Sequence, residues 1–234
     1  MIRGLVLAFV VGFAVPSWAT EITVASFNIR IFSTGSRDDS ELALIADRLQ
    51  QFDLIAIQEL RDEEVVRRTL DILAERGLEY RALVSSRVGR GSLERYAYLW
   101  REKVVQALDA GAIFPDPHDV FSREPYVASF RAGNFDFTLI TMHSIWGDSK
   151  DERRAEALML DDVYQLVQDA DSNEPRLSPC QTIVQCGLGS VPTVSTMMLL
   201  ARPLQPSTFV GARSKPRLDL SRPLYCGAPL RSCE

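Results

Sequence analysis

Apolar positions change their spacing several times between residues 22 and 170. Runs that are continuous or alternate with polar residues predict β-strands, whereas apolar stripes that repeat every three to four residues predict helices. The strands are expected at residues 22–27, 53–59, 80–84, 96–100, 104–108, 126–130 and 135–142, and one helix is expected at 151–170. Strands interspersed with helices predict a layered α/β body.

Two further helices are expected between the first three strands. Ser40 is placed to cap the first, whose apolar stripe runs from Leu42 to Phe52. The second covers about residues 63–76. It is expected to stop at Gly77, because glycine readily adopts the left-handed conformation that ends many helices.

The strand at residues 53–59, within the sequence DLIAIQEL, has a charged end. Its apolar residues 54–57 do not alternate with polar ones, so both faces of the strand are expected to be covered. Glu59 nevertheless closes the run, and a charge at the mouth of a buried strand is costly unless it is paired or bound to a metal. Two interpretations are open: a solvated strand end, or a metal ligand held on a rigid element.

The N-terminus has the pattern of a secretory signal. Arg3 precedes an apolar run from Leu5 to Val15, and the small residues Ser17 and Ala19 fit a cleavage site. A membrane anchor is the alternative, but the run is too short to span about 30 Å of hydrocarbon. We therefore expect residues 1–19 to be a signal peptide and the protein to be secreted or periplasmic, with no membrane segment after cleavage.

Charge divides the chain near residue 174. Residues 175–234 carry seven Lys or Arg and two Asp or Glu, which is a net charge of +5. The whole chain has a net charge of −5, so residues 1–174 carry −10. A body this acidic must bind nucleic acid through local arginines and bound cations rather than through a global field.

The composition of residues 175–234 also differs from that of the body. This tail contains all four cysteines and eight of the twelve prolines. Four cysteines in an exported chain predict two disulfides, with three connectivities open. Apart from Val191–Leu200, no strand or helix period is evident there. We expect residues 175–234 to be an atypical, poorly ordered tail.

Five segments carry the candidate chemistry. They read ITVASFNIRIF at 22–32, DLIAIQELRD at 53–62, ERYAYLWR at 94–101, FSREP at 121–125 and FTLITMHS at 137–144. In this order and spacing they resemble the deoxyribonuclease I family, a branch of the endonuclease/exonuclease/phosphatase superfamily, over about residues 22–170. The resemblance implies an α/β (α+β) four-layer sandwich of two packed mixed sheets flanked by helices, of which residues 20–174 form the N-terminal part. It also implies a secreted, metal-dependent endonuclease that hydrolyses DNA.

The resemblance implies roles for four residues near strand ends. Glu59 matches the family's ligand for Mg²⁺ or Mn²⁺, and Asn28 matches an amide that helps hold the metal and the scissile phosphate. His143 matches the catalytic histidine, and Glu94 matches the carboxylate that fixes its tautomer. The alternatives are a satisfied core histidine at position 143 and a surface acid at position 94.

Four further matches concern the grip on double-stranded DNA. Arg61 resembles the residue that reaches into the minor groove. Arg30 and Arg123 resemble phosphate contacts, and Ser144 resembles a hydroxyl donor. Such contacts position a duplex without reading its sequence. The alternative for each arginine is an ordinary solvated charge.

Three acids match a different part of the family. Asp116, Asp119 and Glu124 lie where the family has a structural calcium loop. The small disulfide that some relatives have at this loop has no counterpart in the sequence, since all four cysteines lie after residue 174. The resemblance therefore implies a Ca²⁺ site at this loop without its covalent support.

The sequence departs from the family after residue 170. A Gly-Asp-Phe-Asn turn, a later aspartate and a C-terminal Asp-His pair are missing, and His118 and His143 are the only histidines. A shifted reading frame across Cys186–Leu200 permits a string that resembles a family segment, which indicates a frame shift or truncation. We expect residues 22–170 to supply about half of the sandwich, and the chain to be unstable or to aggregate. Even if folded, it is expected to lack measurable nuclease activity. The alternatives are another phosphoesterase, acting on a lipid head group or a small phosphate ester, and a non-catalytic remnant.

Overall fold

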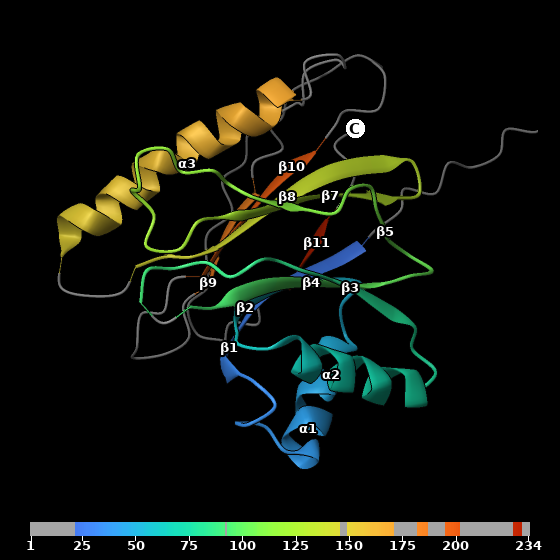
Figure 1. Ribbon diagram of the computed structural model, residues 1–234. Helices are drawn as coiled ribbons and strands as arrows, with labels where there is room; N and C mark the ends of the chain where they lie inside the picture. Colours follow the sequence, from blue (N-terminus) through green and yellow to red (C-terminus); the bar gives the residue numbers. More distant parts are fainter. Residues whose placement is uncertain are drawn as a thin grey trace, which may run out of the picture.

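Two β-sheets lie face to face in the computed structural model, with helices on both outer sides (Figure 1). The structure describes residues 22–91, 93–145 and 149–170, together with the backbone of three later strands, 182–186, 195–201 and 227–230. One sheet has the strand order β11-β1-β2-β4-β3, and the other has the order β5-β7-β8-β10-β9 with β6 paired to β7. The sandwich of two packed sheets flanked by helices is therefore confirmed.

The elements follow the chain in a mixed order. The helices are α1 (Asp39–Leu49), α2 (Glu63–Glu75) and α3 (Lys150–Ala170). The strands up to α3 are β1 (Ile22–Phe32), β2 (Leu54–Leu60), β3 (Tyr80–Val84), β4 (Arg95–Arg101), β5 (Gln106–Ala107), β6 (Ala112–Ile113), β7 (Tyr126–Ala132) and β8 (Phe135–His143). The strands after α3 are β9 (Thr182–Cys186), β10 (Ser195–Ala201) and β11 (Gly227–Leu230).

The first sheet is mixed, because β1 and β2 run parallel while β4 is antiparallel to both β2 and β3. The parallel pair places Asn28 opposite Gln58, near the carboxyl ends of both strands. The antiparallel pair places the start of β4 beside the same ends, with Arg95 opposite Leu60. One edge of the sandwich therefore collects the ends of β1 and β2 and the beginning of β4.

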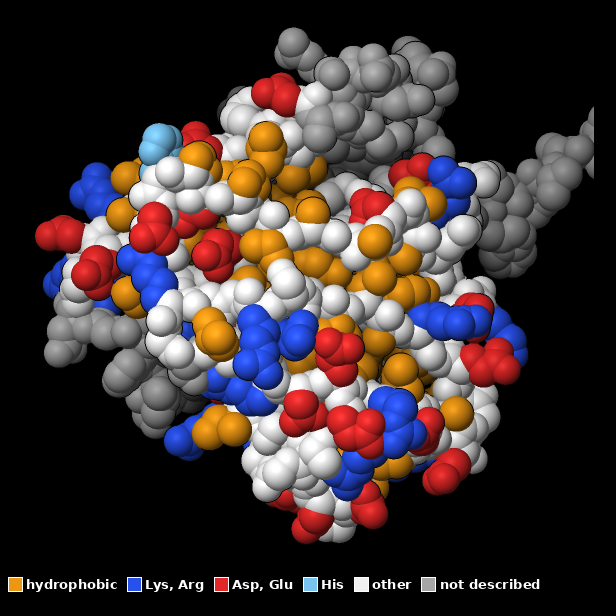
Figure 2. Space-filling view, viewed as in Figure 1, with side chains coloured by type: hydrophobic (Ala, Val, Ile, Leu, Met, Phe, Trp, Pro, Cys, Tyr) orange, Lys and Arg blue, Asp and Glu red, His pale blue; other side chains and the backbone are white. Residues whose placement is uncertain are grey.

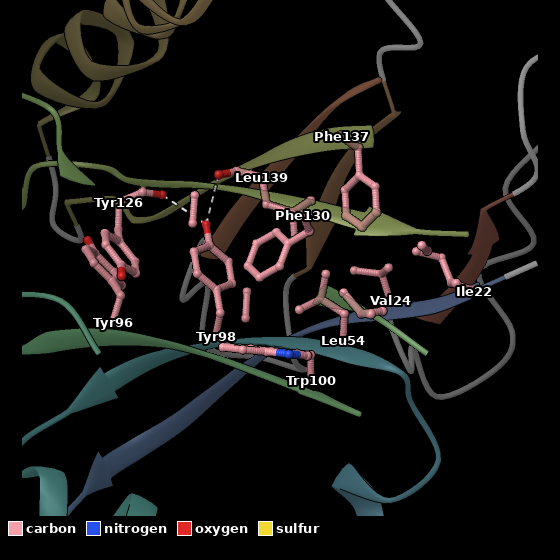
Figure 3. Packing of buried hydrophobic residues seen from close by; sticks show 14 of the residues in the cluster. Ile22, Val24, Leu54, Tyr96, Tyr98, Trp100, Tyr126, Phe130, Phe137 and Leu139 are labelled. Atoms are coloured by element: carbon pink, nitrogen blue, oxygen red, sulfur yellow. Dashed lines mark hydrogen bonds between the residues drawn. The ribbon is translucent and has the colours of Figure 1, made fainter. Parts of the chain in front are cut away.

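An aromatic core fills the space between the sheets (Figure 3). From the first sheet, alternate residues of β4 supply Tyr96, Tyr98 and Trp100. From the second sheet, Phe130 lies with its ring centroid 5.3 Å from that of Tyr98, and the two rings meet edge to face. The Tyr98 hydroxyl donates to the carbonyl oxygens of Tyr126 at 3.0 Å and Leu139 at 3.1 Å. One buried polar atom thus ties β4 to both β7 and β8.

The helices cover the outer faces of the two sheets. Alternate residues such as Ile55 and Leu99 point outward and pack with α1 and α2 in a second core. On the opposite outer face, Ile140 and Met142 of β8 pack with Val163 of α3. Strands that are buried on both faces explain why β2 lacks apolar alternation.

Helix α1 begins at Asp39, so Ser40, the expected cap, lies inside the helix. Asp38, not Ser40, is the N-cap, because its carboxylate accepts from the backbone N–H of Glu41 at 2.9 Å. The carboxylate of Glu41 in turn accepts from the N–H of Asp38 at 3.2 Å, which completes a capping box. The expected end of α2 is confirmed, since Gly77 has a φ of 76° directly after the helix.

Several expectations about strands are corrected. β1 continues to Phe32, and the strand expected at 104–108 shrinks to Gln106–Ala107. Residues 22–170 were expected to supply one half of the sandwich, but β7 and β8 form the centre of the second sheet and pack on the first. Two of the later strands, β9 and β11, also lie where the sequence shows no period, because edge pairing along β10 and β1 needs backbone rather than pattern.

Two expectations fall outside the described residues. The predicted signal peptide occupies residues 1–19, and the structure describes the chain from residue 22. The predicted disulfides concern cysteine side chains after residue 170, which also lie outside the described part. Within the helices that are described, none combines the length and the apolar character needed to cross a bilayer.

Candidate active site

Strand alternation brings three candidate residues toward the space between the sheets. In β1, β4 and β8 the alternate residues Val24, Tyr96 and Leu139 belong to the inter-sheet core. Asn28, Glu94 and His143 lie an even number of residues from these, so the period of two directs all three to the same inner side. His143 ends β8, Glu94 directly precedes β4, and Asn28 is the last residue of β1 before its pairing with β2 becomes irregular.

Glu59 reaches this side by a different route. In β2, Ile55 and Ile57 pack toward the helices, so regular alternation would send Glu59 there too. Its backbone instead has a φ of 61°, in the left-handed region that non-glycine residues rarely adopt. The pairing of β2 with both neighbours is irregular at this point. The distortion turns the carboxylate inward, where Oε1 lies 3.7 Å from Nε2 of His143.

A second strained residue fixes the Glu59 carboxylate. Ile31 has a φ of 50°, which is a true outlier for a β-branched residue. Its backbone N–H donates to Oε2 of Glu59 at 3.1 Å. Conformations of this kind cost on the order of 1–3 kcal/mol each and are typical of functional sites. Two unfavourable backbone conformations thus hold the Glu59 carboxylate next to His143.

His143 is held from two sides. Its Nδ1 lies 2.6 Å from Oε1 of Glu94, and its backbone N–H donates to the hydroxyl of Tyr96 at 3.0 Å. Glu94 is fully buried and His143 is 5% exposed. A carboxylate on Nδ1 selects the tautomer with the proton on that nitrogen and leaves Nε2 as the acceptor facing Glu59. The imidazole is therefore oriented for proton transfer at Nε2.

Two arginines approach the same buried carboxylate. Nε of Arg123 lies 3.1 Å from Oε1 of Glu94, and an Nη of Arg61 lies 3.7 Å from Oε2. Arg61 also donates to the carbonyl oxygen of Leu93 at 3.0 Å. A fully buried carboxylate needs such compensation, because an isolated charge is costly in a protein interior. Both arginine side chains remain about one fifth exposed, so they also border the solvent.

The donor set suits a hard cation. Glu59 supplies carboxylate oxygen, and Asn28 can supply its amide oxygen. The amide nitrogen of Asn28 is buried without a hydrogen-bond partner among the described residues, and as a donor it suits a phosphate oxygen rather than the cation. In the same part of the chain, no three His, Cys, Asp or Glu side chains gather into a metal-binding cluster. Mg²⁺ keeps several waters and needs only one or two carboxylates, whereas a structural Zn²⁺ site needs four protein ligands. The residues present therefore fit Mg²⁺ or Mn²⁺.

Comparison with known proteins agrees with this geometry. No family model matches the sequence. A "Deoxyribonuclease" of Thioalkalivibrio sp. (strain K90mix) is 34% identical over 137 residues, which are 57% of this chain and 37% of that protein. "Deoxyribonuclease-1" of Oryctolagus cuniculus is 33% identical over 162 residues, which are 64% of this chain and 56% of that protein. The chain is related to the deoxyribonuclease I family.

The relationship has a stated extent. The chain spans about half the length of these relatives or less. A solved structure of truncated Caenorhabditis elegans TDP2 superimposes with a TM-score of 0.53 over 79% of this chain and 85% of that one, at 13% identity. This likeness concerns the fold alone. The resemblance to the deoxyribonuclease I family seen in the five sequence segments is confirmed.

Two of the remaining residues implied by the family lie close to site residues in the sequence. Arg30 is exposed on β1, and Ser144 is half-buried directly after His143. Over α1 and α2, on the face shown in Figure 2, basic and acidic side chains are interspersed.

The three acids matched to the family's calcium loop have separate partners. One oxygen of Asp116 accepts from the N–H of Phe121 at 2.8 Å, and Asp119 pairs with Arg90 at 2.8 Å. Glu124 accepts from the N–H of Gly89 at 3.3 Å. The structure does not bring the three carboxylates into one cluster. The other oxygen of Asp116 is buried without a hydrogen-bond partner, and it is the only part of this loop with a spare buried acceptor among the described residues.

Sequence reasoning missed three buried polar residues near the site. Gln58 donates to Thr141 Oγ1 at 2.7 Å and to Ser26 Oγ at 3.1 Å, which joins the two sheets directly below Glu59. Tyr96 supports the backbone of His143. Glu156 of α3 accepts two backbone N–H groups. The signal for Glu156 was available, because it precedes Met159, Leu160 and Val163 by three, four and seven residues and so lies on the buried face of the helix.

Proposed function

We propose that Glu59, Asn28, His143 and Glu94 form a divalent-metal-dependent phosphodiesterase site that hydrolyses DNA. The observation that carries the proposal is the buried chain Glu94–His143–Glu59, with separations of 2.6 and 3.7 Å. In this chain of contacts, a carboxylate that could bind a metal lies beside a histidine whose ring is held by Glu94. The deoxyribonuclease names of the relatives support DNA as the substrate.

In this mechanism each residue has a separate task. Glu59 and the amide of Asn28 would hold Mg²⁺ or Mn²⁺ together with the scissile phosphate. When bound there, the cation would supply positive charge to offset the charge that develops on the phosphate oxygens. Nε2 of His143 exchanges a proton with the attacking water or the leaving oxygen, while Glu94 holds the imidazole and stabilises its charged form.

The proposed partner is double-stranded DNA. Arg61 would enter the minor groove, and Arg30, Arg123 and Ser144 would contact phosphates. Because the body is acidic overall, these side chains and the bound cation must supply the local positive charge. Export to the periplasm or the extracellular space, and a structural Ca²⁺ beside Asp116, belong to the same proposal.

Turnover by this chain is proposed to be impaired. The Asp-His pair that the family has near its C-terminus has no counterpart in the sequence, whose only histidines are His118 and His143. His143 is therefore left without the family's second histidine for the other proton. Because Glu59, His143 and Glu94 lie together, we propose slow cleavage that depends on Glu59 and His143, in place of the complete loss expected from the sequence.

Nicking of supercoiled plasmid DNA tests this proposal, because a single cut per molecule is detectable. The wild-type chain in Mg²⁺ or Mn²⁺ is expected to nick slowly and to stop when a chelator is added. Glu59→Gln should abolish nicking, and His143→Ala should slow it by on the order of 10²–10⁴-fold. Nicking that survives the chelator or both substitutions would contradict the proposal. So would hydrolysis of sphingomyelin or an inositol phosphate in place of DNA.

A further inference from the structure

Glu156 joins the two loops that lead to the candidate site. It lies on α3 and is 2% exposed. Its Oε1 accepts from the backbone N–H of Ser122 at 2.7 Å, and its Oε2 accepts from the backbone N–H of Ile145 at 2.8 Å. Ser122 directly precedes Arg123, and Ile145 follows His143 by two residues. One carboxylate therefore fixes the main chain beside both a candidate phosphate ligand and the candidate proton carrier.

These contacts form a closed ring. From Glu156 the ring passes through Ile145 to His143, whose Nδ1 lies 2.6 Å from Oε1 of Glu94. The same oxygen of Glu94 lies 3.1 Å from Nε of Arg123, in an ion pair without a hydrogen bond. Arg123 leads back through Ser122 to Glu156. The two segments that Glu156 holds, residues 122–123 and 143–145, thus both contact a single oxygen atom of Glu94. The distance between these two segments therefore depends on the Glu156 carboxylate, which binds both of them.

The surroundings of Glu156 would suit an apolar residue. Val163, Met159 and Leu160 lie on the same face of α3 and pack with Phe121 and Met142. Burial raises the pKa of Glu156, while its two backbone N–H bonds, Arg123 and His143 oppose that rise. An apolar residue of similar volume would fill the same space but would leave the backbone N–H groups of Ser122 and Ile145 without their acceptors. Packing alone therefore does not account for a carboxylate at this position.

We propose that Glu156 is a positioning residue, which sets the distance between Arg123 and His143 so that both reach Oε1 of Glu94. This inference rests on the proposed phosphodiesterase function. In that reaction Arg123 binds a phosphate and His143 moves a proton at the same phosphorus. A fixed span between them keeps the two groups in register with one phosphodiester.

Two substitutions separate the positioning role from a packing role. Glu156→Met keeps the volume and removes both acceptors, and Glu156→Gln keeps only one acceptor oxygen. Glu152→Gln is the matched control, because Glu152 is exposed one turn earlier on the same helix. Thermal melts of the full chain should leave the control unchanged and should show that both Glu156 variants still melt cooperatively, with Glu156→Met the less stable because it leaves both N–H groups without an acceptor.

The first readout is spectroscopic and does not require turnover. The Nδ1 proton shared with buried Glu94 should give a protected, downfield proton NMR signal, assigned by its loss in His143→Ala. The exposed His118 is the only other histidine and should give none. We expect the signal to be lost or broadened in both Glu156 variants and retained in Glu152→Gln. If Glu156→Met does not fold, Glu156→Gln alone decides.

The second readout is plasmid nicking. Both Glu156 variants should lose on the order of 10²-fold, the effect expected when a distant change misplaces catalytic groups by about 1 Å. An unchanged signal and unchanged nicking in Glu156→Gln, while His143→Ala loses the signal and slows nicking, would overturn the positioning role and leave the function standing. Nicking that is insensitive to His143→Ala would overturn the function, and the NMR signal would then still report whether Glu156 holds the ring.

Discussion

At the scale of single residues, the site depends on two strained backbones. Glu59 and Ile31 both have positive φ values, and the N–H of one bonds to the carboxylate of the other. The strain at Glu59 redirects a side chain of the proposed site, whereas Ile31 contributes its backbone groups: its N–H donates to Glu59 and its carbonyl oxygen accepts from the hydroxyl of Ser36. Its own side chain is 45% exposed and has little packing to lose. The cost at Ile31 is therefore separable from the function at Glu59.

Ile31→Gly is expected to stabilise the protein by about 1 kcal/mol, because glycine adopts the left-handed conformation without the penalty of a β-branched side chain. The bond from its N–H to Glu59 should remain. Ile29→Gly is the matched control, since Ile29 is buried in the same strand and its loss should destabilise. Urea unfolding measures both. A loss of stability in Ile31→Gly comparable to that in Ile29→Gly would contradict the claim of strain.

At the scale of elements, Asp62 connects the end of β2 to its surroundings. Its carboxylate caps α2 by accepting from the N–H of Val65 at 2.9 Å, and it accepts from the N–H and hydroxyl of Thr34. Partial burial pushes the pKa of Asp62 upward, but these hydrogen bonds outweigh it and the pKa is lowered. The cap thus also holds the loop after β1 against the strand that carries Glu59.

Asp62→Ala should lower the free energy of unfolding by about 1–2 kcal/mol. Because the folded-state pKa is depressed, the stabilising effect is present above the unfolded-state pKa and is lost as pH falls through the folded-state pKa. The difference between variant and wild type should therefore shrink in acid, below about pH 4. Urea unfolding at pH 7 and pH 3 measures it, with Glu75→Ala at the exposed end of α2 as control. A difference of the same size at both pH values would argue against this account.

The elements also show what the sequence could predict. Period and composition were sufficient for β2, α2, β3 and β8, because each has a clear apolar pattern and buried faces. Glu59 was identified as an end residue, but its direction could not be predicted, since alternation points it to the wrong face. Ser40 was chosen as a cap from its type, whereas Asp38 wins by making two reciprocal bonds with Glu41. The local apolar pattern therefore predicts the helices and strands, whereas the direction of Glu59 depends on a backbone distortion that this pattern does not reveal.

At the scale of the whole molecule, the space between the two sheets contains both the main core and the residues of the candidate site. Tyr98 and Phe130 join the sheets through ring packing, and Gln58 bonds across to Thr141 beneath Glu59. The inter-sheet core is built from residues 22 to 139, so the expected exposure of the first sheet is not seen in the described part. Instability and impaired turnover of the full chain remain predictions. A cooperative melt of purified monomer would contradict the first of these.

Binding of Mn²⁺ to the full chain tests the central claim most directly, because it asks whether Glu59 holds a metal without requiring turnover. Free Mn²⁺ is followed by electron paramagnetic resonance for the wild type, Glu59→Gln and the control Glu63→Gln, whose acid is exposed on α2. The account predicts one site that survives in the control and weakens by at least about 10-fold in Glu59→Gln, with unchanged circular dichroism. Equal Mn²⁺ affinity in the wild type and in folded Glu59→Gln would contradict it.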